Sequence, residues 1–263
     1  MDLMLKDRVV MVAAASEGIG YGIAEALARE GARLSIASRS REKIERAASA
    51  LRDRYDVECN AYVMDAAEAQ SIESWSEATL SDFGEVQGLV VNAGGPPPGN
   101  FDDFDDAAWA QGCELTLMSA VRMVRCVLPQ MRRQKSGAIL TVTSSSIKEP
   151  IDHLLLSNVF RAGVVALVKS LANELAGDGI RVNNLVPGRI DTARVRSLDR
   201  MVDGKKGIAV EDEQEEQYAA IPLGRYGSIE DMGSAGAFLL SDAASYITGS
   251  TLVVDGGKMR SVT

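Results

Sequence analysis

Short apolar runs alternate along this chain with longer segments that have helical periodicity. The first is the unbroken run Val9, Val10, Met11 and Val12, and six further strand candidates of mainly apolar or β-branched character follow at residues 33–37, 57–63, 88–91, 138–143, 180–186 and 251–254. An unbroken apolar run suits a strand that is covered on both faces, as in a parallel sheet. Helical patterns separate the runs at residues 21–30, 42–54, 69–83, 106–133, 154–176 and 228–240. The alternation predicts a doubly wound α/β fold, in which a parallel sheet of about seven strands carries helices on both faces.

The first run leads into a turn of small residues and then into a helix. Gly18 and Gly20 lie in this turn. Glycines after a strand let the backbone approach a phosphate, and the helix N-terminus offers free N–H groups and a partial positive charge to a pyrophosphate. The stretch by itself is compatible with a dinucleotide site or with a glycine-rich turn that binds nothing.

Length and composition limit the classes of protein. A chain of 263 residues, 46% of them hydrophobic, is expected to form one α/β domain over residues 1–263. No apolar run approaches the roughly 20 residues of a membrane span. The first residues show no signal-peptide or transit-peptide pattern, so we expect a cytoplasmic protein without a membrane partner.

Charge and metal-ligating residues exclude two further classes. The chain has 28 basic and 37 acidic residues, a net charge of −9, which argues against nonspecific nucleic-acid binding. Cys59, Cys113 and Cys126 have no metal-site spacing, and His153 is the only histidine. We therefore expect free thiols in a reducing compartment and no metal site.

Five motifs in order resemble the short-chain dehydrogenase/reductase family across essentially the whole chain. They are Gly18-Ile19-Gly20, Asp65, Asn92-Ala93-Gly94, Pro187-Gly188-Arg189-Ile190-Asp191-Thr192 and the ending Asp255-Gly256-Gly257. The resemblance implies a Rossmann fold, a nicotinamide cofactor and a small carbonyl or alcohol substrate. It also implies the cofactor-binding residues, which are Ala14, Ser16, Glu17, Gly18, Ile19, Ser38, Arg39, Asp65, Ala66, Asn92, Ala93, Gly94, Pro187, Gly188, Ile190 and Thr192.

The end of the second predicted strand indicates which nicotinamide cofactor is preferred. In dinucleotide folds an acid at this place holds the ribose 2′-hydroxyl, whereas an arginine accommodates a 2′-phosphate. Here Ser38 takes the place of the acid, and Arg39 and Arg41 follow. A guanidinium can grip a phosphate with two hydrogen bonds, so NADP(H) is preferred over NAD(H). The alternative is that both arginines are solvent-exposed side chains at the start of a helix and bind no phosphate.

The glycine turn departs from the family pattern. Ala14 stands where the family usually has glycine. Because alanine strongly prefers negative φ, this turn must differ slightly in shape or carry strain.

The catalytic set departs further. The family uses a serine, a Tyr-x-x-x-Lys pair and an asparagine, and gap-free alignment from the downstream motifs places Ser144, Ser157, Arg161 and Thr116 at these four positions. An aliphatic hydroxyl is a far weaker acid than a phenol, and arginine cannot donate a proton near neutral pH. Arg161 can still hold ribose hydroxyls or a substrate carboxylate. The alternative is a structural ion pair of Arg161 with Glu149 or Asp152. His153 is a candidate proton donor or a surface loop residue.

The loop Asn92 to Gly99 and the Ser157-Asn158-x-x-Arg161 helix are similar to those of a subgroup related to 3-oxoacyl-acyl-carrier-protein reductases. This resemblance implies an NADP-dependent oxidoreductase; the alternative is an NADP-binding sensor or subunit without redox catalysis. It also implies a substrate lid at about residues 193–222. The predicted helix at residues 154–176 is apolar nearly all round, so a homodimer or homotetramer is expected.

Overall fold

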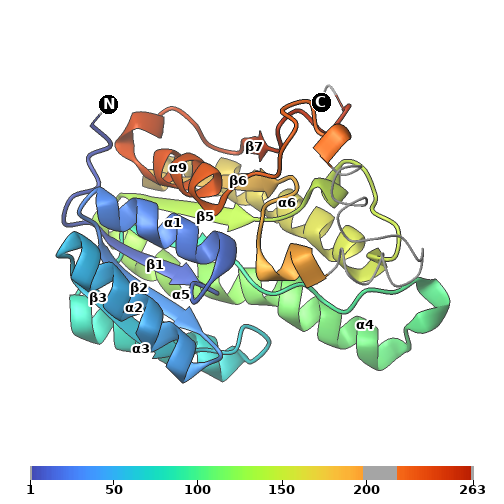
Figure 1. Ribbon diagram of the computed structural model, residues 1–263. Helices are drawn as coiled ribbons and strands as arrows, with labels where there is room; N and C mark the ends of the chain where they lie inside the picture. The colour runs from blue at the N-terminus through green and yellow to red at the C-terminus, as the bar shows by residue number, and fades with distance from the viewer. Residues whose placement is uncertain (1, 198–217, 262–263) are drawn as a thin grey trace.

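A single parallel sheet of seven strands, ordered β3-β2-β1-β4-β5-β6-β7, organises the protein (Figure 1). This computed structural model describes residues 2–197 and 218–261. The strands are β1 (Val9–Ala13), β2 (Arg33–Ser38), β3 (Cys59–Val63), β4 (Gly88–Val91), β5 (Gly137–Val142), β6 (Ile180–Pro187) and β7 (Thr251–Val254). All seven predicted strands are confirmed, with ends that shift by one or two residues. The strand order reverses between β1 and β4, and a crevice is expected beyond the carboxyl ends of strands at such a point.

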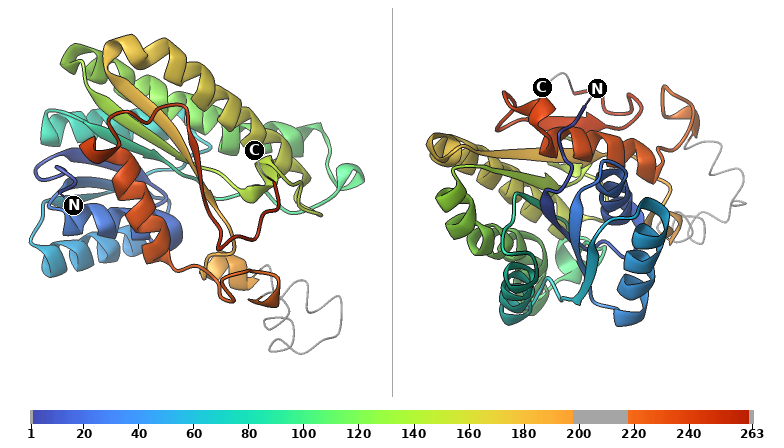
Figure 2. Two further views of the ribbon diagram at one scale, coloured as in Figure 1. Left: turned by 90° about the horizontal axis from the view of Figure 1, so that it is seen from above. Right: turned by 90° about the vertical axis from the view of Figure 1, so that its left-hand side faces the viewer.

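Helices cover both faces of the sheet (Figure 2). The core on one face lies beneath α1 (Gly18–Arg29), α2 (Arg41–Tyr55) and α9 (Ile229–Leu240), and the core on the other lies beneath α3 (Ala69–Phe83), α5 (Ser119–Gln134) and α6 (Leu155–Leu175). Val10 and Val12 of β1 point into the first core, whereas Val9 and Met11 point into the second. Successive residues of a strand face opposite sides, so a strand covered on both sides must be apolar throughout.

The long helix expected at residues 106–133 is present and contains one π-helical turn. It consists of α4 (Asp106–Cys113), a π-helical turn (Glu114–Met118) and α5. The expectation of a long helix is therefore confirmed, and the π-turn is a local widening that leaves the apolar periodicity on either side almost unchanged. The turn carries Thr116, one of the predicted catalytic residues.

Helix α6 corrects the expectation about membrane-length segments. Residues Leu155–Asp178 form the one helix in the described part of the chain that is long and apolar enough to cross a membrane, by length and composition only. Its buried residues Val164, Val168, Ala172 and Leu175 form a stripe that belongs to the core, and the helix packs against β6. This packing is that of a core helix with one buried face.

The predicted lid at about residues 193–222 lies largely outside the described residues. Its two ends, residues 193–197 and 218–222, are described and lie on the carboxyl-terminal side of β6.

Candidate active site

Three of the predicted motifs meet beyond the carboxyl ends of the strands. The Asn92 amide nitrogen, after β4, lies 3.0 Å from where a Cβ on Gly20 would stand. The Thr192 methyl group, after β6, lies 3.5 Å from the corresponding point on Gly18. Residues that are far apart in sequence thus border the N-terminus of α1, which provides a place for a pyrophosphate.

The turn between β1 and α1 is strained at Ala14. Its φ is +50°, in the left-handed region, so of the two expected outcomes, a different turn shape or strain, the structure shows strain. Its carbonyl oxygen lies 2.3 Å from where a Cβ on Gly20 would stand, so the turn requires glycine at position 20. The bend thus brings the carbonyl of Ala14 against the first turn of α1.

We expect Ala14→Gly to stabilise the protein. The left-handed conformation costs alanine roughly 1–2 kcal/mol, which glycine avoids. Glycine also makes the unfolded chain more flexible, and this offsets up to about 1 kcal/mol of the stabilisation. The net increase in the free energy of unfolding is therefore about 1 kcal/mol or less, to be measured by urea denaturation. Ala15→Gly is the matched control, since Ala15 is fully buried and has no positive φ. The control should destabilise, and equal effects of the two changes would contradict the role of φ.

The end of β2 places a cation where the adenosine ribose is expected. Ser38 is buried, and Arg39 directly after it is exposed and has no ion pair within the described residues. The exposed carboxylate of Glu17, in the glycine turn, pairs with Lys43 of α2 at 3.1 Å. After β3, the Asp65 carboxylate accepts a hydrogen bond from the N–H of Ala67 at 3.0 Å. The cation Arg39 therefore has no ion-pair partner among the described residues, whereas the charge of Glu17 is balanced by Lys43.

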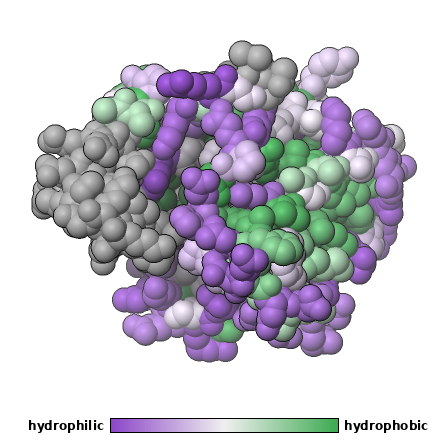
Figure 3. Space-filling view, turned by 90° about the vertical axis from the view of Figure 1, so that its right-hand side faces the viewer, coloured by the Kyte–Doolittle hydropathy of each residue, from purple (hydrophilic) through white to green (hydrophobic). Residues whose placement is uncertain are grey.

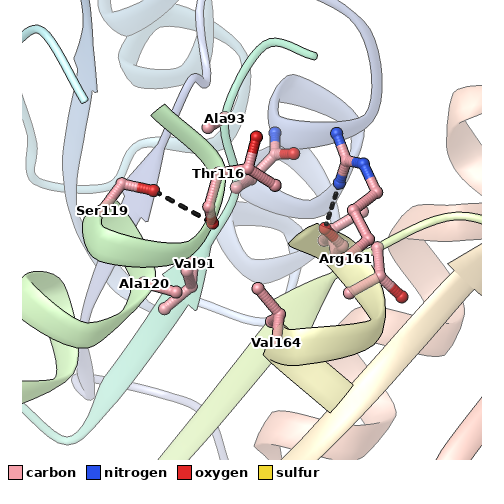
Figure 4. A pocket seen from close by; sticks show the side chains of 10 residues that line it. Val91, Ala93, Thr116, Ser119, Ala120, Arg161 and Val164 are labelled. Atoms are coloured by element: carbon pink, nitrogen blue, oxygen red, sulfur yellow. Dashed lines mark hydrogen bonds between the residues drawn. The ribbon is translucent and has the colours of Figure 1, made fainter. Parts of the chain in front are cut away.

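A small cavity lies where β4, β5, α5 and α6 meet, and Figure 4 shows its lining. The residues around it are Val91, Asn92, Ala93, Thr116, Ser119, Ala120, Val142, Thr143, Arg161 and Val164. Arg161 Nε donates to Ser157 Oγ at 3.0 Å, and Arg161 Nη1 donates to the carbonyl oxygen of Val142 at 3.1 Å. The spacing of four residues on α6 thus places Ser157 and Arg161 in direct contact.

The guanidinium of Arg161 has only neutral partners. No carboxylate lies within 4.0 Å of it in the part of the chain that the structure describes. The predicted alternative, an ion pair with Glu149 or Asp152, is therefore wrong, and Glu149 instead accepts a hydrogen bond from the N–H of Arg260 at 3.0 Å. Desolvation, together with the smaller effect of the positive charge of Arg194, lowers the pKa of Arg161 to about 10. The side chain remains a cation at neutral pH.

The other predicted catalytic residues have different surroundings. Thr116 Oγ1 is buried, lines the cavity and has no hydrogen-bond partner, while the carbonyl of Thr116 accepts from Ser119 Oγ at 3.3 Å (Figure 4). Ser144 Oγ accepts from the N–H of Ser146 at 3.2 Å and caps a short 3₁₀ turn, outside the cavity lining. The structure therefore places Thr116 and Arg161 in the lining of one cavity. Ser157 contacts Arg161 by a hydrogen bond, and Ser144 lies two residues after the end of β5.

The proline-rich loop after β4 is tied to the start of α6. The N–H of Gly99 donates to the carbonyl of His153 at 2.6 Å, and the N–H of Leu155 donates to the carbonyl of Gly99 at 3.3 Å. Asn158 exchanges two hydrogen bonds with the backbone of Ile151 and fixes the same segment. His153 is exposed and does not line the cavity.

Sequence reasoning placed Arg194 in the predicted lid at about residues 193–222, and it did not connect Thr143 to the site. Arg194 Nη2 lies 2.3 Å from where a Cβ on Gly95 would stand, so this guanidinium crosses the loop after β4. The hydroxyl of Thr143 donates to Asn184 Oδ1 at 2.9 Å, which fixes this wall of the cavity. The position of Arg194 two residues after the Pro187 to Thr192 motif could have indicated its place, whereas nothing in the pattern marks Thr143.

Comparison with known proteins gives consistent matches over almost the whole chain. Residues 13–258 match the family model described as Enoyl-(Acyl carrier protein) reductase. The 3-oxoacyl-acyl-carrier-protein reductase FabG of Escherichia coli is 34% identical over 252 residues, which cover 95% of this chain and 96% of that protein. The human dehydrogenase/reductase SDR family member 4 is 31% identical over 254 residues, which cover 96% and 88%.

Two solved structures show the same agreement in three dimensions. L-sorbose reductase from Gluconobacter frateurii, in complex with NADPH and L-sorbose, superposes with a TM-score of 0.95 at 30% identity and 100% coverage of both chains. YwfH, an NADPH-dependent reductase involved in bacilysin biosynthesis, superposes with a TM-score of 0.93 at 27% identity and covers 98% of this chain and 100% of its own. This chain therefore matches these proteins in both sequence and fold along almost its whole length.

Proposed function

This chain belongs to the short-chain dehydrogenase/reductase family, and from that premise we propose that it is a single-domain NADP(H)-dependent oxidoreductase acting on a small carbonyl or alcohol compound. The observation that carries the proposal is Arg161, a desolvated cation beside a cavity that Asn92 and Ala93 also line. The two solved neighbours that act with NADPH support the choice of cofactor.

The cofactor fits this chain in an extended arrangement along the strand ends. The N-terminus of α1 receives the pyrophosphate, because the first N–H groups of a helix have no partner within the helix. Arg39 binds the 2′-phosphate of the adenosine ribose, and Asp65 borders the adenine. Asn92 and the Pro187 to Thr192 stretch border the nicotinamide end, close to Arg161. When bound, NADPH supplies the hydride.

Proton transfer differs from the family pattern, because Ser157 and Arg161 occupy the positions of the tyrosine and the lysine. Arg161 remains protonated at neutral pH, so it stabilises negative charge on the substrate oxygen and orients the bound groups. Ser144 Oγ is an acceptor toward the N–H of Ser146 and keeps its own O–H for the substrate oxygen. We infer that the alkoxide formed on hydride addition takes this proton, and that water returns one to Ser144.

Turnover of NADPH with a panel of aldehydes, ketones and 2-oxo acids tests the proposed function. We expect at least one compound to accelerate the loss of NADPH absorbance in proportion to enzyme concentration. Calorimetry that detects NADPH binding while no compound is reduced would overturn the proposal and indicate a nucleotide-binding subunit instead.

We further propose that α6 and α5 face a second copy of the chain. On the outer side of α6, Val159 is 45% exposed, and Ala162 and Ala166 are exposed with it. Figure 3 shows that apolar surface gathers in one broad area on this side of the molecule. A helix that is apolar on both its core and its outer face needs a second covering surface.

Light scattering at micromolar concentration should report the mass of a dimer or a tetramer. Val159→Asp should shift the protein toward monomer, whereas Val63→Asp should leave the mass unchanged, since Val63 has a similar exposure of 43% but lies on the edge strand β3. A monomeric wild-type protein would contradict the proposed interface. A cytoplasmic location and the absence of a nucleic-acid partner stay predictions.

A further inference from the structure

We propose that the substrate carries a carboxylate or a similar anionic group, which Arg161 and Arg194 bind together. This inference rests on the proposed function, because it concerns the substrate that enters beside the nicotinamide end of the cofactor. It is based on two guanidinium groups that the fold brings together without a counterion within the described residues.

The first observation is the unused binding capacity of Arg161. A guanidinium has five N–H donors. Arg161 uses its Nε toward Ser157 and its Nη1 toward the Val142 carbonyl, and both acceptors are neutral. A desolvated cation without an opposite charge is costly, and an arriving anion removes this cost.

The second observation is the position of Arg194. Its Nη2 occupies the space next to Gly95, where any larger residue would displace it. Gly95 lies three residues after Asn92, which lines the same cavity as Arg161. The exposed Arg194 therefore has its guanidinium at the same strand end as Arg161. In agreement with this placement, the charge of Arg194 lowers the pKa of Arg161. An anion bound between them would convert this repulsion into two charge-assisted interactions.

A neighbouring arginine does have a carboxylate partner, so the lack of a counterion among the described residues is particular to Arg194 and not a feature of every arginine in this segment. Arg196, two residues after Arg194, forms two hydrogen bonds with the carboxylate of Asp191, at 2.7 and 3.0 Å. No such carboxylate lies within 4.0 Å of Arg194 among residues 2–197 and 218–261. Arg194 is therefore left for a partner that the described residues do not supply.

The phosphates of the cofactor have other binding groups in the proposed arrangement. The N-terminus of α1 receives the pyrophosphate and Arg39 receives the 2′-phosphate. The nicotinamide end carries no phosphate, and its oxidised ring is itself a cation. The anion that suits Arg161 and Arg194 is therefore expected on the substrate.

Calorimetric titration of the NADPH-loaded protein tests the inference. Pyruvate and phenylglyoxylate serve as probes, each compared with its neutral amide. We expect at least one carboxylate to bind about tenfold or more tightly than its amide, as charge-assisted hydrogen bonds to two guanidinium groups imply. Arg194→Met should remove most of this preference without changing the affinity for the amide. Gly95→Ala should act in the same direction by displacing the Arg194 side chain.

Arg196→Met is the matched control, because it removes the same charge from the same segment and should keep the preference. The inference is overturned if neither carboxylate binds better than its amide, or if Arg196→Met weakens carboxylate binding as much as Arg194→Met. It is also overturned if Arg194→Met chiefly weakens NADPH binding to the free protein, since the cofactor phosphates would then be the anion. Carboxylate preference without any NADPH oxidation would support the anion site and contradict the proposed oxidoreductase function.

Discussion

Arg161→Met is expected to lower the turnover of NADPH about a hundredfold or more, the loss observed when one donor to a developing oxyanion is removed. The midpoint of thermal unfolding of the cofactor-free protein should stay within about 3 °C of the wild-type value. The substitution removes two hydrogen bonds to neutral acceptors, but it also removes a desolvated charge without a counterion. These two effects on stability have opposite signs.

Arg181→Met provides the contrasting structural control. Arg181 donates hydrogen bonds to three backbone carbonyls, those of Leu239, Ser241 and Ile247, at 2.8 to 3.4 Å. Its loss should lower the unfolding temperature while the folded fraction keeps its turnover. If Arg161→Met behaves like Arg181→Met, with lower stability and normal turnover, Arg161 is structural. Arg161→Lys should recover part of the turnover, since it keeps the charge but loses the planar fork.

Arg39→Ala is expected to weaken NADPH binding by roughly tenfold to a hundredfold and to leave NADH binding unchanged. A hydrogen bond to a charged group contributes about 1.5–3 kcal/mol, and about 1.4 kcal/mol corresponds to one factor of ten. Arg39 is exposed directly beyond the buried Ser38, without an ion pair among the described residues, so it is available to a 2′-phosphate. Titration of both cofactors against wild type and variant gives the two dissociation constants.

Arg46→Ala is the matched control for the loss of one positive charge. Arg46 lies in α2, is 68% exposed and pairs with Glu42 at 3.6 Å. It should leave both dissociation constants unchanged. Equal losses for NADPH and NADH in Arg39→Ala would show that Arg39 supports the fold of the cofactor site rather than reading the phosphate.

The amino-acid sequence by itself determined the order of strands and helices and the place of the glycine turn. The reason is local: an apolar run such as Val9 to Val12 can be satisfied only between two covering layers, and a periodicity of 3.6 residues fits only a helix with one core face. The strain at Ala14 was also predictable, because the preference of alanine for negative φ belongs to the residue itself.

The tertiary structure alone decided which side chains share the site and which partners they have. The π-turn at Thr116 leaves the apolar period intact, so the pattern could not reveal it. The spacing of four residues already places Ser157 beside Arg161 on α6, but the sequence left an acidic partner as an alternative. Only the packing of α6 against the end of β5 gives Arg161 the Val142 carbonyl instead. Arg194 reaches Gly95 across about a hundred residues of chain because β4 and β6 end at the same edge of the sheet. Contacts of this kind depend on distances between elements, which no local pattern encodes.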